Sequence, residues 1–336
     1  MFVNKENINN TIKTWLIIMY FLVITMVVVG GLTRLTDSGL SITSWELFSG
    51  LLPPVNIEEW NYYFNEYKKI PEYKYVNSGM SISEFKVIFY WEYAHRLLAR
   101  IVGLASLIPI LYLSMRNKGS FLYLKKYLII FFLICLQGFI GWFMVSSGLV
   151  NNTDVSHYRL ALHLSVALII IIVILWQIFL IYDVEKFNLR VNNSIILILF
   201  FLIFFQIVIG AFLAGLNGGL IYNTWPDMNG YLYPNDISLN YYLTLESFSN
   251  PSVIQFYHRL IGYLIIIFVL FLNYVFLKKK IEMKYMMIFN FTILFQIILG
   301  ILALTSGVEI KFASLHQFGS ILVLSSYLLI FYKNTN

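Results

Sequence analysis

Long apolar runs alternate with polar connections along the whole chain. A helix that crosses a bilayer needs roughly 20 apolar residues. Only helices and closed barrels satisfy their backbone hydrogen bonds in lipid, and runs of this length exclude a barrel. The pattern therefore predicts an all-α integral membrane protein with eight transmembrane helices, at about residues 15–33, 91–113, 123–145, 160–181, 194–214, 254–277, 285–304 and 313–332.

Composition agrees with a membrane protein and removes one class of partner. Of the 336 residues, 59% are hydrophobic and only 12% are charged, which is too apolar for a soluble protein. The formal net charge is +6, and its distribution along the chain follows the membrane sidedness described next. No nucleic acid is therefore expected as a partner.

Basic residues fall on one side of the membrane if the eight helices alternate in direction. By the positive-inside rule that side is cytoplasmic, or the matrix in a mitochondrion. The opposite side carries two long loops, at about 34–90 and 215–253. We expect a multi-pass protein of the inner (plasma) membrane with both termini cytoplasmic. The basic residues concerned are Lys5, Lys13, Arg116, Lys118, Lys125, Lys126, Lys186, Arg190, Lys278, Lys279, Lys280, Lys284 and Lys333, and the second loop carries Asp227, Asp236 and Glu246.

The chain contains an internal repeat of four helices. The segment VVVGGLTRLTDSGLSITSW, which ends at Trp45, corresponds to IVIGAFLAGLNGGLIYNTW, which ends at Trp225. In this register Gly30 matches Gly210. Further along, EYAHRL corresponds to QFYHRL, and LQGFIGWFMVSSG corresponds to FQIILGILALTSG. Repeated units of this kind indicate a duplicated architecture.

The repeat predicts two pseudo-symmetric four-helix bundles, residues 1–182 and residues 183–336. Each unit has an even number of helices, so both enter the membrane in the same direction, and an axis along the membrane normal should relate them. We therefore expect two similar bundles side by side.

Four of the five histidines occupy matching places in the repeat. His95 and His163 lie in the first half, and His258 and His316 lie in the second. Each is predicted to open an even-numbered helix on the outer side, so the four imidazoles should lie at a similar shallow depth. His157 has no counterpart and is interpreted as a surface histidine.

Two histidines on facing helices of a bundle favour haem over zinc. Haem iron takes two axial imidazoles on opposite faces of a flat ring. Zinc would ordinarily need further Cys, Asp or Glu ligands, and only Glu92 is near, in one half only. The single cysteine, Cys135, lies within LICLQGF and is interpreted as a small packing residue.

Residues around the histidines fit a haem site on the outer side. Four arginines are candidate partners of haem propionates: Arg96, Arg100, Arg159 and Arg259. Six small residues could make room for a macrocycle, or could equally serve close helix packing: Gly103, Gly138, Gly141, Gly262, Gly300 and Gly319.

The two halves differ at one ionisable position. Glu92 precedes His95 by three residues, so on a helix its carboxylate lies beside the predicted iron ligand, over the porphyrin edge. The matching residue of the second half is Gln255, which cannot exchange a proton. This asymmetry suggests that the first site holds a haem that is chemically altered and the second a haem that moves electrons. A salt bridge from Glu92 to Arg96 is the structural alternative, and both can hold at once.

These motifs together resemble the heme A synthase family over essentially the whole chain. The resemblance rests on GGLTRLTDSGLSITSW, EYAHRL, LQGFIGWFMVSSGL, RLALHL, NGGLIYNTWPDMNG, QFYHRLIGY and SLHQFGS. It implies an enzyme that oxidises the methyl group at carbon 8 of heme O to a formyl group, giving heme A, with oxygen derived from water.

The resemblance also implies roles for particular residues and partners. His95 and His163 would ligate the substrate haem, His258 and His316 would ligate a permanent haem b, and Glu92 would be the essential carboxylate. Heme O synthase would donate the substrate, cytochrome oxidase assembly would receive the product, and a homo-oligomer is conceivable. The external-loop cysteine pair of some bacterial members is absent between Leu35 and Phe89, so the chain resembles the proteobacterial and mitochondrial branch.

Two other functions compete with this interpretation. A di-haem b-type electron carrier explains all four histidines but leaves the difference between Glu92 and Gln255 without a use. A transporter would need polar or broken segments near the middle of the membrane, where this chain has Ile, Leu and Phe.

Overall fold

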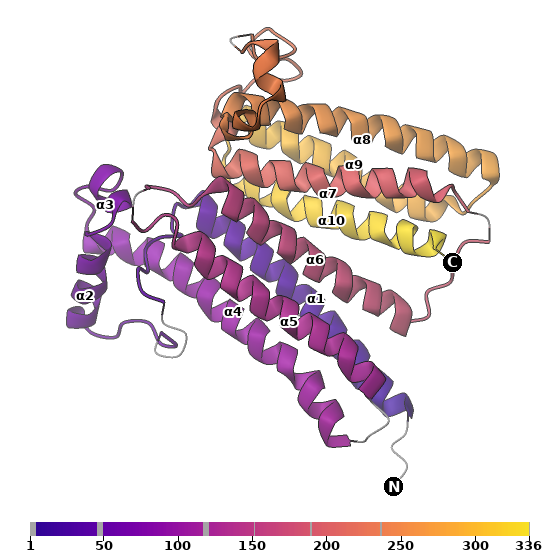
Figure 1. The fold of residues 1–336 in the computed structure, drawn as a ribbon, viewed down its shortest axis with the longest axis horizontal. Coiled ribbons are helices and arrows are strands. Elements are labelled where there is room, and N and C mark those ends of the chain that lie inside the picture. Colours follow the sequence, from indigo (N-terminus) through magenta and orange to yellow (C-terminus); the bar gives the residue numbers. More distant parts are fainter. Residues whose placement is uncertain are drawn as a thin grey trace. The chain divides into compact units, whose positions relative to one another are not determined.

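The computed structural model describes residues 5–45, 50–116, 121–150, 152–188, 190–235 and 237–335. Lys118 and Asp236, used above for sidedness, lie outside these ranges. All the elements of regular structure within them are helical, as Figure 1 shows, and the only β-type pairing among them is one isolated bridge between Met228 and Tyr231. The all-α prediction is confirmed.

Eight of the described helices are long and apolar enough to cross a membrane, which confirms the predicted number. They are α1 (Lys5–Leu35), α4 (Ile82–Arg116), α5 (Phe121–Val145), α6 (His157–Ile181), α7 (Asn193–Gly215), α8 (Pro251–Lys279), α9 (Met283–Thr305) and α10 (Ile310–Asn334). Within the described residues, the loops between them hold two short α-helices, α2 (Ile57–Tyr67) and α3 (Pro71–Tyr75), and the 3₁₀ helices η2 (Gly218–Leu220), η3 (Leu239–Leu243) and η4 (Leu245–Ser249).

Helix α4 begins at Ile82 and not, as the sequence predicted, near residue 91. Its additional turns carry Phe85 and Phe89, which are buried in an aromatic cluster with Trp60 and Phe64 of α2. Packing of these aromatic rings stabilises the first turns of α4, whose sequence is not apolar enough to predict a membrane-spanning segment. His95 therefore lies well inside α4, and the expectation that each histidine opens its helix is wrong for this one.

The described part of the first long loop, between α1 and α4, is folded, which the sequence pattern did not indicate. The Asn56 side chain caps α2 by accepting a hydrogen bond of 2.8 Å from the backbone N–H of Glu59. Tyr67 is fully buried at the end of α2, and its hydroxyl accepts a hydrogen bond from Asn77 at 2.7 Å. A capped helix and a satisfied buried hydroxyl give this loop a defined shape.

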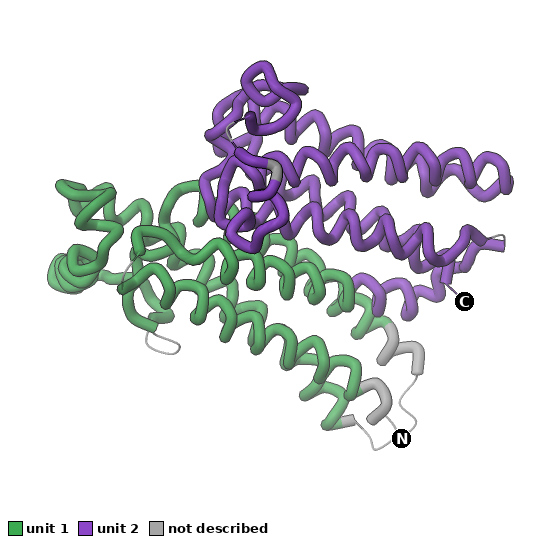
Figure 2. Tube along the Cα trace, turned by 45° about the horizontal axis from the view of Figure 1, so that its top comes forward, with its two compact units in different colours: residues 1–174 green, residues 175–336 purple. Residues whose placement is uncertain are grey.

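The chain divides into two compact units, residues 1–174 and residues 175–336 (Figure 2). This division falls inside α6, whereas the repeat predicts a boundary after residue 182. In the first unit, α4 packs against α1 and α5. In the second, α7 packs against α8 and α10, and α10 packs against α9. The arrangement as two symmetric bundles stays a prediction.

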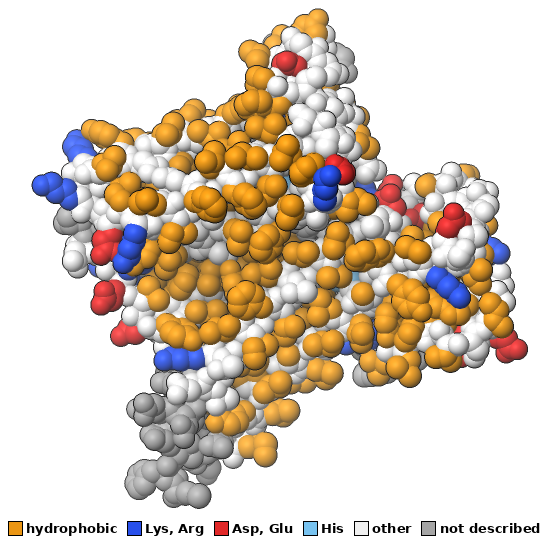
Figure 3. Space-filling view, turned by 180° about the vertical axis from the view of Figure 1, so that it is seen from behind, with side chains coloured by type: hydrophobic (Ala, Val, Ile, Leu, Met, Phe, Trp, Pro, Cys, Tyr) orange, Lys and Arg blue, Asp and Glu red, His pale blue; other side chains and the backbone are white. Residues whose placement is uncertain are grey.

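Apolar side chains cover much of the helix surface, as the view in Figure 3 shows. Phe21 on α1, Leu104 on α4 and Phe291 on α9 are each more than 60% exposed. Side chains of this kind on membrane-length helices are suited to lipid. Cys135 on α5 is also exposed, so its interpretation as a buried packing residue is wrong.

The external position of the two long loops can be tested by labelling. Asn61 on α2 and Asn235 before η3 are exposed, so cysteines at these places should react with a membrane-impermeant thiol reagent in spheroplasts. The background protein should carry Cys135→Ser, with a cysteine at Lys280 between α8 and α9 as the inside control. Labelling at Lys280 but not at Asn61 or Asn235 would invert the topology.

Candidate functional site

Each of the four paired histidines packs its ring against a glycine on a neighbouring helix. A Cβ atom built on the glycine would lie about a van der Waals contact or less from Cε1 of the facing imidazole. The distances are 3.3 Å for Gly30 and His95, 3.0 Å for Gly141 and His163, 3.3 Å for Gly210 and His258, and 2.8 Å for Gly300 and His316. The glycines that matched in the sequence repeat therefore serve the same purpose in both halves.

The glycine at position 300 offers a direct test of this packing. In Gly300→Ala the new methyl group would lie 2.8 Å from His316 Cε1, and overpacking of this kind typically costs about 1–3 kcal/mol. We expect the purified variant to lose much of the haem that the second half is predicted to bind, measured as haem per protein. Gly103→Ala is the matched control, because a Cβ on Gly103 meets nothing within 4 Å, and its haem content should not change.

The geometry of the second pair fits two ligands of one iron. The ring centroids of His258 and His316 are 6.3 Å apart, with the ring planes at 73°. An imidazole nitrogen binds a transition metal at about 2 Å and lies about 1 Å from its ring centre, so two imidazoles on opposite sides of one ion have centroids about 6 Å apart. The Nδ1 atom of His316 lies 3.2 Å from the Gln296 carbonyl oxygen, a contact that orients the ring.

The first pair, His95 on α4 and His163 on α6, lies within the first unit. Nowhere in the described ranges do three His, Cys, Asp or Glu side chains gather as they would around an isolated metal ion. The donor set is thus two imidazoles in each half, which suits the axial positions of haem.

A glutamine accompanies three of the histidines, and the sequence analysis did not single it out as a site residue. Gln137, Gln206 and Gln296 each lie one helical turn before the glycine that faces the histidine. Each donates its side-chain N–H to the main-chain oxygen of that histidine at 2.9 Å. The available signal was the recurrence of Gln followed four residues later by Gly in three helices.

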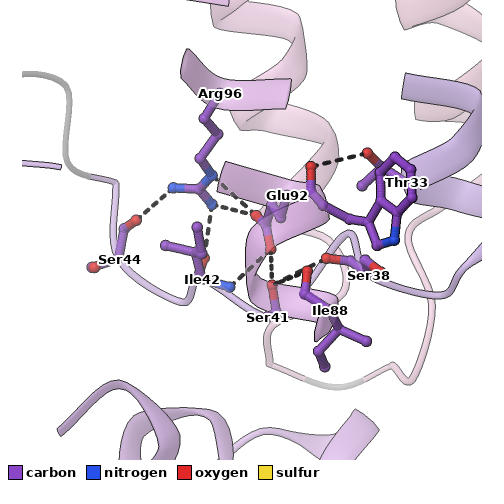
Figure 4. A network of polar contacts seen from close by, with 9 residues as sticks. Thr33, Ser38, Ser41, Ile42, Ser44, Ile88, Glu92 and Arg96 are labelled. Carbon is purple, nitrogen blue, oxygen red and sulfur yellow. Dashed lines mark hydrogen bonds and ion pairs between the residues drawn. The ribbon is translucent and has the colours of Figure 1, made fainter. Parts of the chain in front are cut away.

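Glu92 accepts hydrogen bonds from the loop that follows α1 (Figure 4). Its side chain is buried, and one carboxylate oxygen accepts hydrogen bonds from Ser41 Oγ at 2.7 Å and from the Ile42 backbone N–H at 2.8 Å. The other oxygen accepts from Arg96 Nε at 3.0 Å and from an Arg96 terminal nitrogen at 2.7 Å. Both oxygens thus face the loop and Arg96 rather than open space over a ring edge, and the alternative ion pair with Arg96 is present.

Arg96 and Arg259 bind main-chain carbonyls in equivalent ways. Arg96 donates to the Ile42 oxygen at 2.7 Å and to the Ser44 oxygen at 2.8 Å. Arg259 donates to the Tyr222 oxygen at 3.0 Å and to the Asp227 oxygen at 2.7 Å. Each arginine therefore holds the loop after the first helix of its half, and pairing with propionates stays a prediction for both.

Gln255 contacts the same loop position as Glu92 but with opposite polarity. Its side-chain N–H donates to the Tyr222 oxygen at 2.9 Å, whereas Glu92 accepts from the N–H of Ile42. Ile42 and Tyr222 match in the sequence repeat. The framework is thus shared by the two halves, and the ionisable group is present in the first only.

The two remaining predicted arginines lie in the first unit. Arg159 donates a hydrogen bond to the Phe143 carbonyl oxygen at 2.6 Å, near the C-terminal end of α5. A positive charge at this end of a helix also interacts favourably with the helix dipole. Arg100 lines a small cavity together with Arg96, Ile42 and Tyr93. His157 begins α6, six residues before His163, and its ring centroid lies 4.2 Å from that of Tyr158.

Glu72 on α3 is a second buried carboxyl group that sequence reasoning missed. Burial raises its pKa to about 8, partly offset by a hydrogen bond with Tyr67, and the charge of Glu92 raises it further. A carboxyl of this kind is protonated near neutral pH. Glu72 is the second residue of a short helix in a polar loop, and nothing in the sequence there predicts that its side chain is buried.

Comparison with known proteins relates the sequence of this chain to one family. The COX15-CtaA family, described as cytochrome oxidase assembly protein, matches residues 13–328. The chain is 60% identical to a heme A synthase of Pelagibacter ubique over 336 residues, which is 100% of both chains. It is 43% identical to a heme A synthase of Agrobacterium fabrum over 261 residues, covering 77% of this chain and 72% of the relative. A heme A synthase of Rickettsia bellii is 39% identical over 318 residues, covering 93% and 94%.

Proposed function

Since the chain belongs to the heme A synthase family, shown by the match over residues 13–328 and by a full-length relative at 60% identity, we propose that it converts heme O into heme A. The reaction is the oxidation of the methyl group at carbon 8 of the porphyrin to a formyl group. With oxygen from water, a methyl group and one water molecule give a formyl group, four protons and four electrons. An electron acceptor and a group that manages protons are therefore both required.

The observation that carries this proposal is the single ionisable difference between two otherwise matching frameworks. Glu92 and Gln255 occupy the same place next to His95 and His258, and both contact the loop after the first helix of their half. Only the first half can hold or accept a proton there. We therefore assign His95 and His163 to the substrate haem, and His258 and His316 to a resident haem b.

The resident haem b would supply electron transfer when bound. Glu92 would hold negative charge beside the substrate haem, where it stabilises positive charge that develops during oxidation of the methyl carbon. Arg96 and Ser41 fix its orientation. Because both oxygens are already hydrogen bonded, an electrostatic role is favoured over proton abstraction, which would require Arg96 or the loop to move.

Analysis of extracted haem tests the proposal against its main competitor. A di-haem b-type electron carrier would also use four histidines packed on four glycines. The purified synthase should contain haem b together with heme O or heme A, measured by pyridine haemochrome spectra and mass spectrometry. Two equivalent haems b and no heme A under oxidase-supporting growth would favour the carrier.

Partners follow from the chemistry of substrate and product. Heme O is an apolar haem, so a heme O synthase in the same membrane is the expected donor. Cytochrome oxidase assembly is the expected recipient of heme A, in line with the family description. We place the protein in the inner membrane with both termini cytoplasmic and the haem sites toward the outer face, and an arrangement as a homo-oligomer belongs to the same proposal.

A further inference from the structure

Three of the four histidines are held by a side-chain amide. The amide nitrogen of Gln137, Gln206 or Gln296 lies 2.9 Å from the main-chain oxygen of His163, His258 or His316. The same nitrogen lies 3.3, 3.3 and 3.4 Å from Nε2 of the same residue. The hydrogen bond to the main-chain oxygen fixes the helical turn that carries each histidine, and the amide packs beside the imidazole ring.

Two of these glutamine side chains lie against glycines of another helix. A Cβ atom on Gly319 of α10 would collide with the side-chain oxygen of Gln296, and one on Gly262 of α8 would lie 3.5 Å from the side-chain nitrogen of Gln206. Gly319 therefore makes room for the Gln296 side chain, whereas the Gln206 side chain lies at an ordinary contact distance from Gly262.

His95 is the exception. In the register that matches Gly30 with Gly210, the place of Gln206 is taken by Met26. Methionine has no hydrogen-bond donor. Across the part of the chain that the structure describes, no hydrogen bond is found to the His95 ring, which packs on Gly30.

The orientation of the His95 ring also differs. For His163 and His316, Nδ1 lies nearer than Nε2 to a Cβ built on the facing glycine, at 3.6 against 3.8 Å and 3.2 against 3.6 Å. For His95 the order is reversed, with Nε2 at 3.4 Å and Nδ1 at 4.0 Å from such an atom on Gly30. His95, which has no glutamine amide beside it, is therefore also the histidine whose ring is rotated relative to those of His163 and His316.

We propose that His95 is the exchangeable axial ligand of the first haem site, and that Met26 in place of a glutamine makes it so. His163, His258 and His316 are the fixed ligands. The inference rests on the proposed function, in which the first haem must enter and leave while haem b stays. It assigns Met26 and the three glutamines as positioning residues, and it places the labile side of the substrate site at the contact between α1 and α4.

Carbon monoxide tests this, because it binds ferrous haem only where an axial ligand leaves. In the reduced holoprotein with both haems bound, CO should combine with the first haem and not with haem b. Met26→Gln should slow this reaction by about tenfold, the effect of about one added hydrogen bond. The reciprocal variant Gln206→Met should make haem b react with CO. In each variant, an unchanged low-spin spectrum of the haem in the half that was not mutated shows that the protein is folded.

His95→Ala and His163→Ala identify which ligand leaves. The Fe–CO stretching frequency of the native protein should equal that of His95→Ala, where CO lies opposite His163. A match with His163→Ala, or no CO binding at the first haem of the native protein, would overturn the assignment of His95, as would a Met26→Gln protein that reacts at the native rate. If both alanine variants leave the first haem's low-spin spectrum unchanged, the ligand assignment of the proposed function is wrong instead.

Discussion

Glu92→Gln is expected to form little or no heme A while it still folds, keeps haem b and binds heme O. Loss of an acid–base or charge-stabilising group commonly costs about 100-fold or more in rate. The structure adds a second effect, since the new amide N–H₂ must face either the N–H of Ile42 or the guanidinium of Arg96, which are both donors. The measurement is heme A per bound haem in membranes supplied with heme O.

A matched variant separates the charge of Glu92 from its role in holding the loop. Ser41→Ala removes one hydrogen bond of 2.7 Å to the carboxylate and leaves the charge and Arg96 in place. One neutral donor is worth about 0.5–1.5 kcal/mol, so heme A formation should fall by less than about tenfold. Equal losses in Ser41→Ala and Glu92→Gln would make Glu92 a loop anchor, and near-normal heme A from Glu92→Gln would remove it from the chemistry.

Replacing His258 or His316 with alanine is expected to abolish the low-spin haem b of the second half. The two rings are 6.3 Å apart, and removal of either leaves an iron with one strong axial ligand. The haem of the first half should stay, because its ligands belong to other helices. Low-temperature absorption and electron paramagnetic resonance spectra, with haem content per protein, provide the measurement.

His157→Ala is the control for that experiment. The residue is a histidine at the start of α6, its ring is tilted by 38° against that of Tyr158, and it has no counterpart in the repeat. Its haem content and spectra should match those of the native protein. An unchanged haem b spectrum in both His258→Ala and His316→Ala would refute the ligand assignment of the second half.

Several features of the site were readable in the sequence because they repeat. His95 and His258 align together with Gly30 and Gly210, and the structure brings each histidine onto its aligned glycine. The difference between Glu92 and Gln255 was also visible. What the carboxylate contacts was not, because Ser41 and Ile42 reach it only through the path of a loop.

The sequence by itself determined the eight membrane helices, since lipid selects for local apolar length and each helix satisfies its own backbone. Tertiary structure decided where α4 begins, because aromatic packing with α2 compensates for turns that are not apolar. It also decided which amides hold which imidazoles. In the sequence, Gln206 is an isolated polar residue within FFQIVIG. Its side chain contacts His258 because of how α7 is rotated against α8. The matching position of α1 is Met26. Contacts between helices depend on how helix faces meet, and hydropathy along one chain does not contain that information.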